Sequence, residues 1–201
     1  MYTHLGVSSE LSVNDINQSV IKESEYLLVE GYLVTSEETQ KVASYSLDIA
    51  TKLGVKKIIT LSDPNVVKFF RDNILELLNK SFDIIFCNQQ EALNISMTDN
   101  IDDAIDFLKK YAHEIIITCG EDGAYVTLGS EKFHEIPDRV KPVDLTGAGD
   151  MFLAAYIFAR VSNKSVTNRI KFANTCSGNV IQKYGAKLDT LDYSKLLKEL
   201  Q

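Results

Sequence analysis

The sequence predicts an α/β fold in which helices cover both faces of a mainly parallel sheet, followed by a β-hairpin and further helices. Two observations support this prediction. Short segments rich in Ile, Leu and Val alternate with segments whose apolar residues recur every three or four positions, a pattern typical of βαβ units. Two further strand-like segments, residues 124–128 and 132–136, flank Gly129-Ser130, which is a hairpin signal. We therefore expect a three-layer α/β/α arrangement with a C-terminal hairpin.

The expected strands are short, and they are apolar enough to be buried on both faces of a sheet. The parallel strands are residues 26–30, 57–61, 82–87 and 114–118, and the hairpin pairs residues 124–128 with residues 132–136.

The expected helices follow from apolar residues three or four positions apart. The first has Ser36 as a candidate N-cap, with Glu37 and Glu38 in its first turn. The helices are residues 36–53, a segment after Pro64 that carries Val66, Phe70, Ile74 and Leu77, residues 101–108, and then residues 148–162, 166–183 and 193–200. No repeat or linker interrupts this order, so we expect a single domain over residues 1–201.

Composition and charge exclude several classes of protein. A net charge of -7 argues against a nucleic-acid binder that neutralises phosphates. No apolar run reaches the roughly 18 residues of a membrane span, and the first residues lack the pattern of a signal peptide. Cys87, Cys119 and Cys176 are far apart and indicate free thiols in a reducing compartment. We therefore expect a cytoplasmic protein that binds neither nucleic acid nor membrane.

Residues 144–150, Asp-Leu-Thr-Gly-Ala-Gly-Asp, form a small glycine-rich turn that leads into an apolar helix. Such a turn leaves backbone N–H groups unpaired at the helix start, where the helix dipole favours an anion. Asp150 falls in the first helical turn. A carboxylate beside a phosphate-sized anion hole can deprotonate a hydroxyl that attacks phosphorus. The simpler alternative is an ordinary helix start with an acid in its first turn.

Two other polar segments follow expected strands, where open parallel sheets bind ligands. Asn88 and Glu91 lie three apart after residues 82–87. They indicate either a ligand-binding pair or a capping box. Gly120 and Gly123 follow Thr118. They allow either close approach of a ligand to the backbone or a plain tight turn.

Taken together, these motifs resemble those of the ribokinase (pfkB) family of sugar and nucleoside kinases, which carries them in the same order. Its second signature is usually Asp-Thr-x-Gly-Ala-Gly-Asp, and Leu145 stands here in place of the Thr. The resemblance implies that Asp150 is the catalytic base and that the backbone amides of Gly147, Ala148 and Gly149 stabilise the transferring phosphoryl group. Side-chain bulk at either glycine would then close the space of that group.

The same resemblance implies cofactors and the residues that bind them. The cofactors are ATP, Mg²⁺ and a monovalent cation such as K⁺. Thr118, Gly120, Gly123 and Asn174 would line the nucleotide site, Asn88 and Glu91 would help to hold Mg²⁺ and phosphates through water, and Asp144 and Thr146 would hold the monovalent cation.

Part of the family pattern has no counterpart in this sequence. Family members usually begin with a strand whose acid binds the sugar, followed by a Gly-Gly signature and a β lid. Residues 1–6 resemble only the last lid strand, and residues 30–32, Glu-Gly-Tyr, resemble the adenosine-kinase-like branch. We therefore expect the nucleotide-binding and catalytic part of such a kinase without most of its N-terminal acceptor-binding part. The exposed sheet edge would favour a homodimer or a partner chain that supplies the missing strands.

Two functional hypotheses follow. The first is an ATP-dependent kinase that transfers the γ-phosphate to a hydroxymethyl group of adenosine or a related nucleoside or sugar. The second is an impaired fragment, or one half of a split enzyme, that binds nucleotide and needs a partner segment. A dehydrogenase of the dinucleotide-binding type is disfavoured, because no Gly-x-Gly-x-x-Gly turn follows an early strand.

Overall fold

The computed structural model describes residues 6–199. Within that range six strands form one mixed sheet in the order β1-β2-β3-β4-β5-β6, which confirms the predicted α/β class. The chain divides after Ile115, inside β4 (Ala112–Thr118), into two compact units, here called unit 1 and unit 2. The single domain expected over residues 1–201 stays a prediction. Of the segment expected to resemble a lid strand, residues 1–5 lie outside the described range.

The first three strands of unit 1 are parallel, and paired residues near their centres are buried. They are β1 (Tyr26–Glu30), β2 (Lys56–Thr60) and β3 (Phe82–Asn88). Val29 pairs with Ile59, and Ile59 pairs with Ile85. All three side chains are at most 2% exposed. Burial on both faces explains the consecutive apolar residues of β2 and β3, whereas Leu28 of β1 is 43% exposed.

The helices of unit 1 follow the sequence-based expectation with one correction and one α-helix, Gln18–Glu23, that was not predicted. They are the α-helices α1 (Gln18–Glu23), α2 (Glu37–Leu53), α3 (Pro64–Phe69), α4 (Arg71–Leu78), α5 (Gln89–Ser96) and α6 (Ile101–Leu108), and the 3₁₀ helices η1 (Gly6–Glu10), η2 (Val13–Asp15) and η3 (Gly31–Thr35). The single helix expected after Pro64 is wrong, because Phe70 leaves the helical region with φ −124° and ψ 33°. A new helix then begins at Arg71.

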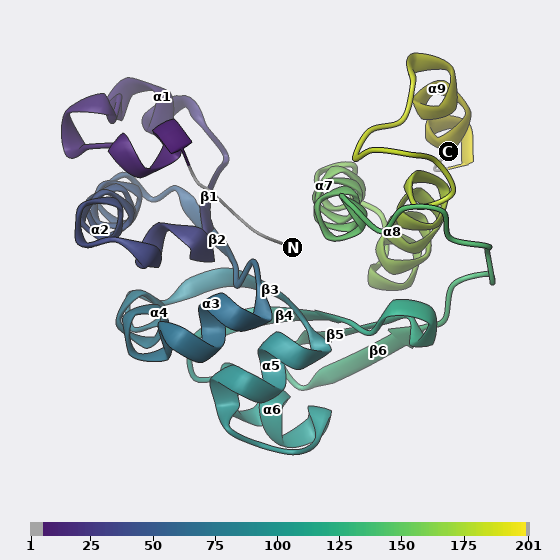
Figure 1. Ribbon diagram of the computed structural model, residues 1–201, viewed down its shortest axis with the longest axis horizontal. Helices are drawn as coiled ribbons and strands as arrows, with labels where there is room; N and C mark the ends of the chain where they lie inside the picture. Colours follow the sequence, from purple (N-terminus) through teal and green to yellow (C-terminus); the bar gives the residue numbers. More distant parts are fainter. Residues whose placement is uncertain (1–5, 200–201) are drawn as a thin grey trace. The chain divides into compact units, whose positions relative to one another are not determined.

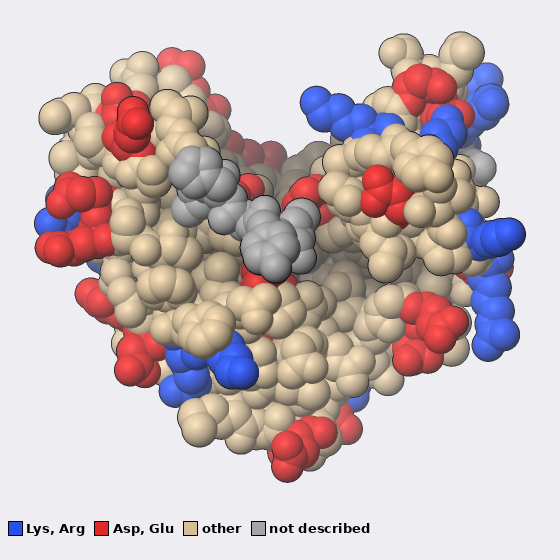
Figure 2. Space-filling model, viewed as in Figure 1, with Lys and Arg blue, Asp and Glu red and all other residues tan. Residues whose placement is uncertain are grey.

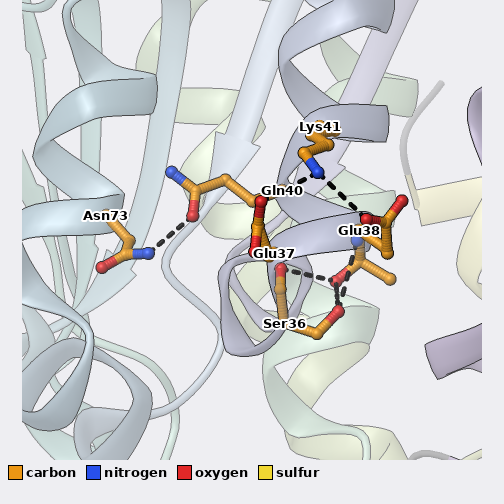
Figure 3. Close-up of polar contacts among 7 residues, drawn as sticks. Ser36, Glu37, Glu38, Gln40, Lys41 and Asn73 are labelled. Atoms are coloured by element: carbon orange, nitrogen blue, oxygen red, sulfur yellow. Dashed lines mark hydrogen bonds and ion pairs between the residues drawn. The ribbon is translucent and has the colours of Figure 1, made fainter.

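The start of α2 shows how local sequence fixes this part of the fold. Ser36 Oγ accepts a hydrogen bond of 3.2 Å from the N–H of Thr39, as its predicted role as N-cap requires. Side chains then join α2 to α4 (Figure 3): Asn73 Nδ2 donates to Gln40 Oε1 at 2.5 Å. Gln40 Nε2 donates in turn to Glu76 at 2.8 Å. A predicted cap and a long-range amide bridge therefore hold the same helix.

Unit 2 contains the predicted hairpin and a pair of packed helices. Its elements after β4 are the 3₁₀ helix η4 (Gly120–Asp122), β5 (Ala124–Leu128), β6 (Glu131–Glu135), α7 (Ala148–Val161), α8 (Val166–Val180) and α9 (Thr190–Glu199). β5 and β6 are antiparallel, with Tyr125 stacked on His134. α7 and α8 lie side by side (Figure 1), and Tyr156 of α7 is fully buried. None of the helices in residues 6–199 combines the length and apolar character needed to cross a membrane.

Candidate functional site

Asp144 fixes the loop that precedes α7. One carboxylate oxygen accepts the N–H of Thr146 at 2.9 Å, and the other accepts the N–H of Gly185 at 2.9 Å. These bonds, first that from Gly185 and then that from Thr146, hold the pKa of Asp144 below its ordinary value. The N–H of Asp144 also donates to the carbonyl of Ile181. Asp144 is therefore an anchor between this loop and the segment after α8.

Gly147 is required by backbone conformation and by close packing. It precedes α7 with φ 80°, a region that side chains rarely adopt. A Cβ added there would lie 2.7 Å from the Cβ of Ala186 and 2.8 Å from its Cα. By contrast, a Cβ on Gly149 would meet no protein atom within 4 Å. Space for a transferring group is thus open at Gly149, whereas Gly147 is already packed against the protein.

The first turn of α7 presents unpaired backbone donors. No side chain caps this helix, and among the described residues the N–H groups of Gly147, Gly149 and Asp150 have no hydrogen-bond acceptor. Ala148 differs, because its N–H donates to the carbonyl of Leu145 at 3.3 Å. The unpaired donors therefore include the N–H of Asp150, which was not predicted from the sequence. The N–H of Ala148, which was expected to be available for a phosphoryl group, already donates to Leu145. Such a turn suits an anion.

Asp150 lies at the exposed start of α7, in its first turn. Among the described residues its carboxylate makes no hydrogen bond and no ion pair. A carboxylate without partners, next to unpaired N–H donors, can accept a proton from a hydroxyl bound in front of it. This is the chemistry that the sequence motif predicts for Asp150.

The Gly120–Gly123 segment forms a tight turn between β4 and β5. Gly120 has φ 60° and Gly123 has φ 86°. The N–H of Cys119 donates to the carbonyl of Gly123 at 2.7 Å. A Cβ on Gly123 would lie 2.0 Å from the carbonyl oxygen of Glu135, whereas one on Gly120 would meet nothing within 4 Å. Gly123 therefore serves the turn itself, and Gly120 leaves open space after the half-buried Thr118.

Asn174 connects α8 to the end of β6. Its side chain is 8% exposed, and Nδ2 donates to the carbonyl of Glu135 at 3.0 Å. One N–H of the amide is therefore used in holding the fold. Contact between Asn174 and an adenine stays a prediction.

In unit 1, Asn88 and Glu91 form the capping box that the sequence left as one of two alternatives. Glu91 Oε2 accepts the N–H of Asn88 at 3.0 Å, and Glu91 Oε1 accepts its Nδ2 at 2.6 Å. Asn88 Oδ1 accepts the N–H of Glu91 at 2.9 Å. Glu91 is 3% exposed. Burial raises its pKa to about 7, with Asp63 adding to the rise and the bond from Asn88 opposing it.

This geometry limits the way in which Glu91 could hold a metal ion. Among the described residues, no group of three or more His, Cys, Asp or Glu side chains could form a cage. Each oxygen of Glu91 accepts one bond and keeps lone-pair capacity. Mg²⁺ usually retains several waters and uses one or two carboxylates. The pair therefore fits a water-mediated role and not direct, multidentate ligation.

The predicted site residues fall into two groups. Asn88 and Glu91 belong to unit 1, and the structure defines their geometry there. The other residues belong to unit 2, where hydrogen bonds join the 144–150 loop to Gly185. Gly185 and Ala186 were not predicted as site residues. The Gly-Ala pair after α8 is the signal that could have identified them.

Comparisons with known proteins place these features in a family. The sequence pattern of the pfkB family carbohydrate kinases matches residues 1–192. Ribokinase from Lactococcus lactis is 27% identical over 193 residues, which cover 84% of this chain and 63% of that protein. The crystal structure of adenosine kinase from Sinorhizobium meliloti matches with a TM-score of 0.87 and 30% identity, over 94% of this chain and 59% of that one.

A third comparison supports the fold. A putative Ribokinase II from E. coli, solved in complex with ATP and Mg²⁺, matches with a TM-score of 0.84 at 22% identity. The match covers 94% of this chain and 64% of that protein. The chain thus spans less than two thirds of each of these relatives. The match over residues 1–192, together with the 144–150 loop, shows that the chain belongs to the pfkB family of carbohydrate kinases.

Proposed function

We propose that this chain is the nucleotide-binding and catalytic part of an ATP-dependent phosphotransferase. It would transfer the γ-phosphate to a hydroxymethyl group of a nucleoside or sugar. Membership of the pfkB family supports the general activity. The observation that carries the proposal is that, within residues 6–199, the carboxylate of Asp150 and the N–H groups of Gly149 and Asp150 have no hydrogen-bond partner.

In the proposed reaction the start of α7 performs two tasks. The free N–H groups and the helix dipole stabilise negative charge on the transferring phosphoryl group. The loss of one such donor typically costs about 3 kcal/mol of transition-state stabilisation. Asp150 accepts the proton of the attacking hydroxyl. Asp144 acts at one remove, because its bonds to Thr146 and Gly185 hold the loop in place.

The proposal gives the cofactors specific places. ATP would lie along the Gly120–Gly123 turn and the start of α7, and Asn88 with Glu91 would help to hold Mg²⁺ through water. Mg²⁺ bound to the phosphates would neutralise charge that develops on them. Asp144 already accepts an N–H bond on each carboxylate oxygen. These bonds make it a loop anchor and leave lone-pair capacity on both oxygens. A monovalent cation at Asp144 and Thr146 stays a proposal, and no proposed step needs it.

We propose an adenosine-like acceptor as the first candidate. The adenosine kinase from Sinorhizobium meliloti is among the similar structures, and Glu30-Gly31-Tyr32 resembles the corresponding branch. Gly31 is fixed by packing, since a Cβ there would lie 2.5 Å from the carbonyl oxygen of Leu61.

The test is transfer of γ-phosphate from ATP to a panel of nucleosides and sugars by the wild type, Asp150→Asn and the control Asp138→Asn. Asp138 is an exposed acid in the same unit. Transfer by the wild type and the control but not by Asp150→Asn supports the proposal. Equal transfer by all three removes Asp150 from the mechanism.

The second candidate is a nucleotide-binding module that needs a partner segment for turnover. It is favoured by the finding that the chain spans 59% of the Sinorhizobium meliloti adenosine kinase. Calorimetry with ATP and Mg²⁺ separates the two candidates. Binding without turnover on every acceptor supports the second one, and robust turnover by the chain alone excludes it.

A further inference from the structure

A cavity of unit 1, lined by residues of α3, α4 and α5, has the composition of an anion-binding site. It has a volume of about 460 Å³, within the range of small-molecule sites. No residue of the predicted phosphoryl-transfer site lines it. Its polar lining consists of two cations and three carboxamides from α3, α5 and the start of α4: Lys68, Arg71, Asn65, Gln90 and Asn94. No Asp or Glu is part of this lining.

Arg71 is held in place before any ligand arrives. Its Nε donates to the carbonyl of Ile95 at 3.0 Å, and its guanidinium carbon lies 6.0 Å from the centre of the Phe107 ring. The bond through Nε leaves the two terminal nitrogens of the guanidinium as donors. A planar fork of this kind matches the oxygens of a phosphate or carboxylate.

Among the described residues Lys68 and Arg71 have no carboxylate partner, in contrast to some but not all of the other cations of this unit. Lys80, for example, lies 2.6 Å from Asp48, and Lys109 lies 2.8 Å from Asp106. The chain as a whole carries a net charge of -7, so acidic side chains are abundant. Figure 2 shows Lys and Arg side chains gathered at the position that α3 occupies in Figure 1.

Two of the three carboxamides of the cavity, those of Gln90 and Asn94, are ordered by hydrogen bonds. Asn94 Nδ2 donates to the carbonyl of Pro64 at 3.1 Å, and Asn94 Oδ1 accepts a bond of 2.9 Å from Gln90 Nε2. After these bonds Gln90 and Asn94 each keep one N–H donor, and the side-chain oxygen of Gln90 stays an acceptor. Donors next to two cations select a ligand rich in acceptor oxygens. Met97, which is 75% exposed, adds an apolar wall.

We propose that this cavity binds a small molecule that carries a phosphate group. Arg71 and Lys68 contact the phosphate oxygens, and the amides of Asn65 and Gln90 donate to the remaining acceptors. The volume exceeds what a phosphate ion needs, which leaves room beside Met97 for the organic part of a phosphate ester. The proposal is independent of phosphoryl transfer at Asp150, because every residue involved belongs to another part of the chain.

The test is a titration of the ¹⁵N-labelled full chain with inorganic phosphate and with ribose 5-phosphate, at constant ionic strength set with NaCl. We expect saturable shifts of the amide signals of residues 64–71 and 90–97. Tighter binding of the ester indicates an organic phosphate, and equal binding indicates recognition of the phosphate group alone. Shifts that are absent, or that NaCl reproduces, overturn the proposal.

Charge reversal distinguishes this cavity from general attraction of anions. Lys68→Glu changes an exposed residue, so the variant is expected to fold, and binding should weaken at least about ten-fold. Arg71→Gln should weaken it similarly. The matched control is Lys109→Glu, at a lysine of the same unit that is already paired with Asp106. Equal weakening by Lys68→Glu and Lys109→Glu also overturns the proposal.

Discussion

The carboxylate of Asp144 accepts a 2.9 Å hydrogen bond from the backbone N–H of Gly185, 41 positions further along the chain. This bond joins the loop before α7 to the segment after α8. The same segment places Ala186 against Gly147. The start of α7, where Asp150 lies, is therefore held in place by contacts between residues that are distant in the sequence.

Removal of the Asp144 anchor should loosen this loop in a pH-dependent manner. Hydrogen bonds from Gly185 and Thr146 lower the pKa of Asp144 below 3.8 in the folded chain. The stabilisation is thus present above pH 3.8 and is lost as the pH falls through the folded pKa. Asp144→Ala should unfold at lower urea concentration than the wild type at neutral pH, and the difference should shrink in acid. A difference that stays constant down to acid pH would contradict the anchoring role.

The two glycines of the motif should respond in opposite ways to alanine. Gly147→Ala places a side chain at φ 80° and against Ala186. It should therefore destabilise the chain by at least about 1–3 kcal/mol. Gly149→Ala fills open space in a helix and should stabilise it by about 0.4–1 kcal/mol, while reducing phosphoryl transfer. Urea unfolding and the transfer assay measure both effects. If Gly147→Ala were as stable as the wild type, the packing of Gly147 against Ala186 would not limit the stability of the chain.

Glu91 should make stability depend on pH near neutrality. Burial raises its pKa from 4.5 to about 7 in the folded chain. The folded state then binds the proton more tightly than the unfolded state. Its contribution to stability is full below pH 4.5 and is lost as the pH rises through about 7. The corresponding free energy is about 3 kcal/mol at most.

The matched variant for this effect is Glu91→Gln, which removes the titration and keeps most of the side-chain volume. Urea unfolding at several pH values should show that the difference in stability between wild type and variant changes in favour of the variant as the pH rises from 4.5 to about 7. A difference that does not vary with pH would show that Glu91 stays ionised in the folded chain.

The turn after β4 offers another matched pair. Gly123→Ala would bring a Cβ to 2.0 Å from the carbonyl oxygen of Glu135, at φ 86°. Gly120→Ala, at φ 60°, meets open space and should cost only the conformational strain, about 1–2 kcal/mol. Thermal unfolding should therefore rank Gly123→Ala well below Gly120→Ala. The reverse order would contradict the structural role given to Gly123.

Local sequence signals predicted much of this fold, because the interactions involved are local. Ser36 caps α2 through Thr39, three residues away, and Gly129-Ser130 joins two strands that pair directly. The break at Phe70 was not predictable from apolar spacing, since Ile74 and Leu77 continue the same period and are buried in a separate helix.

The motif of the candidate site was predictable from the sequence, but the contacts that hold its residues in place were not. Asn88 and Glu91 carried two alternatives, and only the structure shows the capping box and the burial of Glu91. The bond from Gly185 to Asp144 depends on how α8 packs against α7. A contact of that kind has no signature in the spacing of residues.

The most direct test of the central claim is the turnover of γ-phosphate by Asp150→Asn compared with wild type, together with calorimetric affinity for ATP. Asn keeps the shape of the side chain and removes its capacity to accept a proton. We expect the turnover of Asp150→Asn to fall by about 10²–10⁴-fold while its affinity for ATP is maintained. Turnover equal to that of the wild type would contradict the role of Asp150 as the base in phosphoryl transfer.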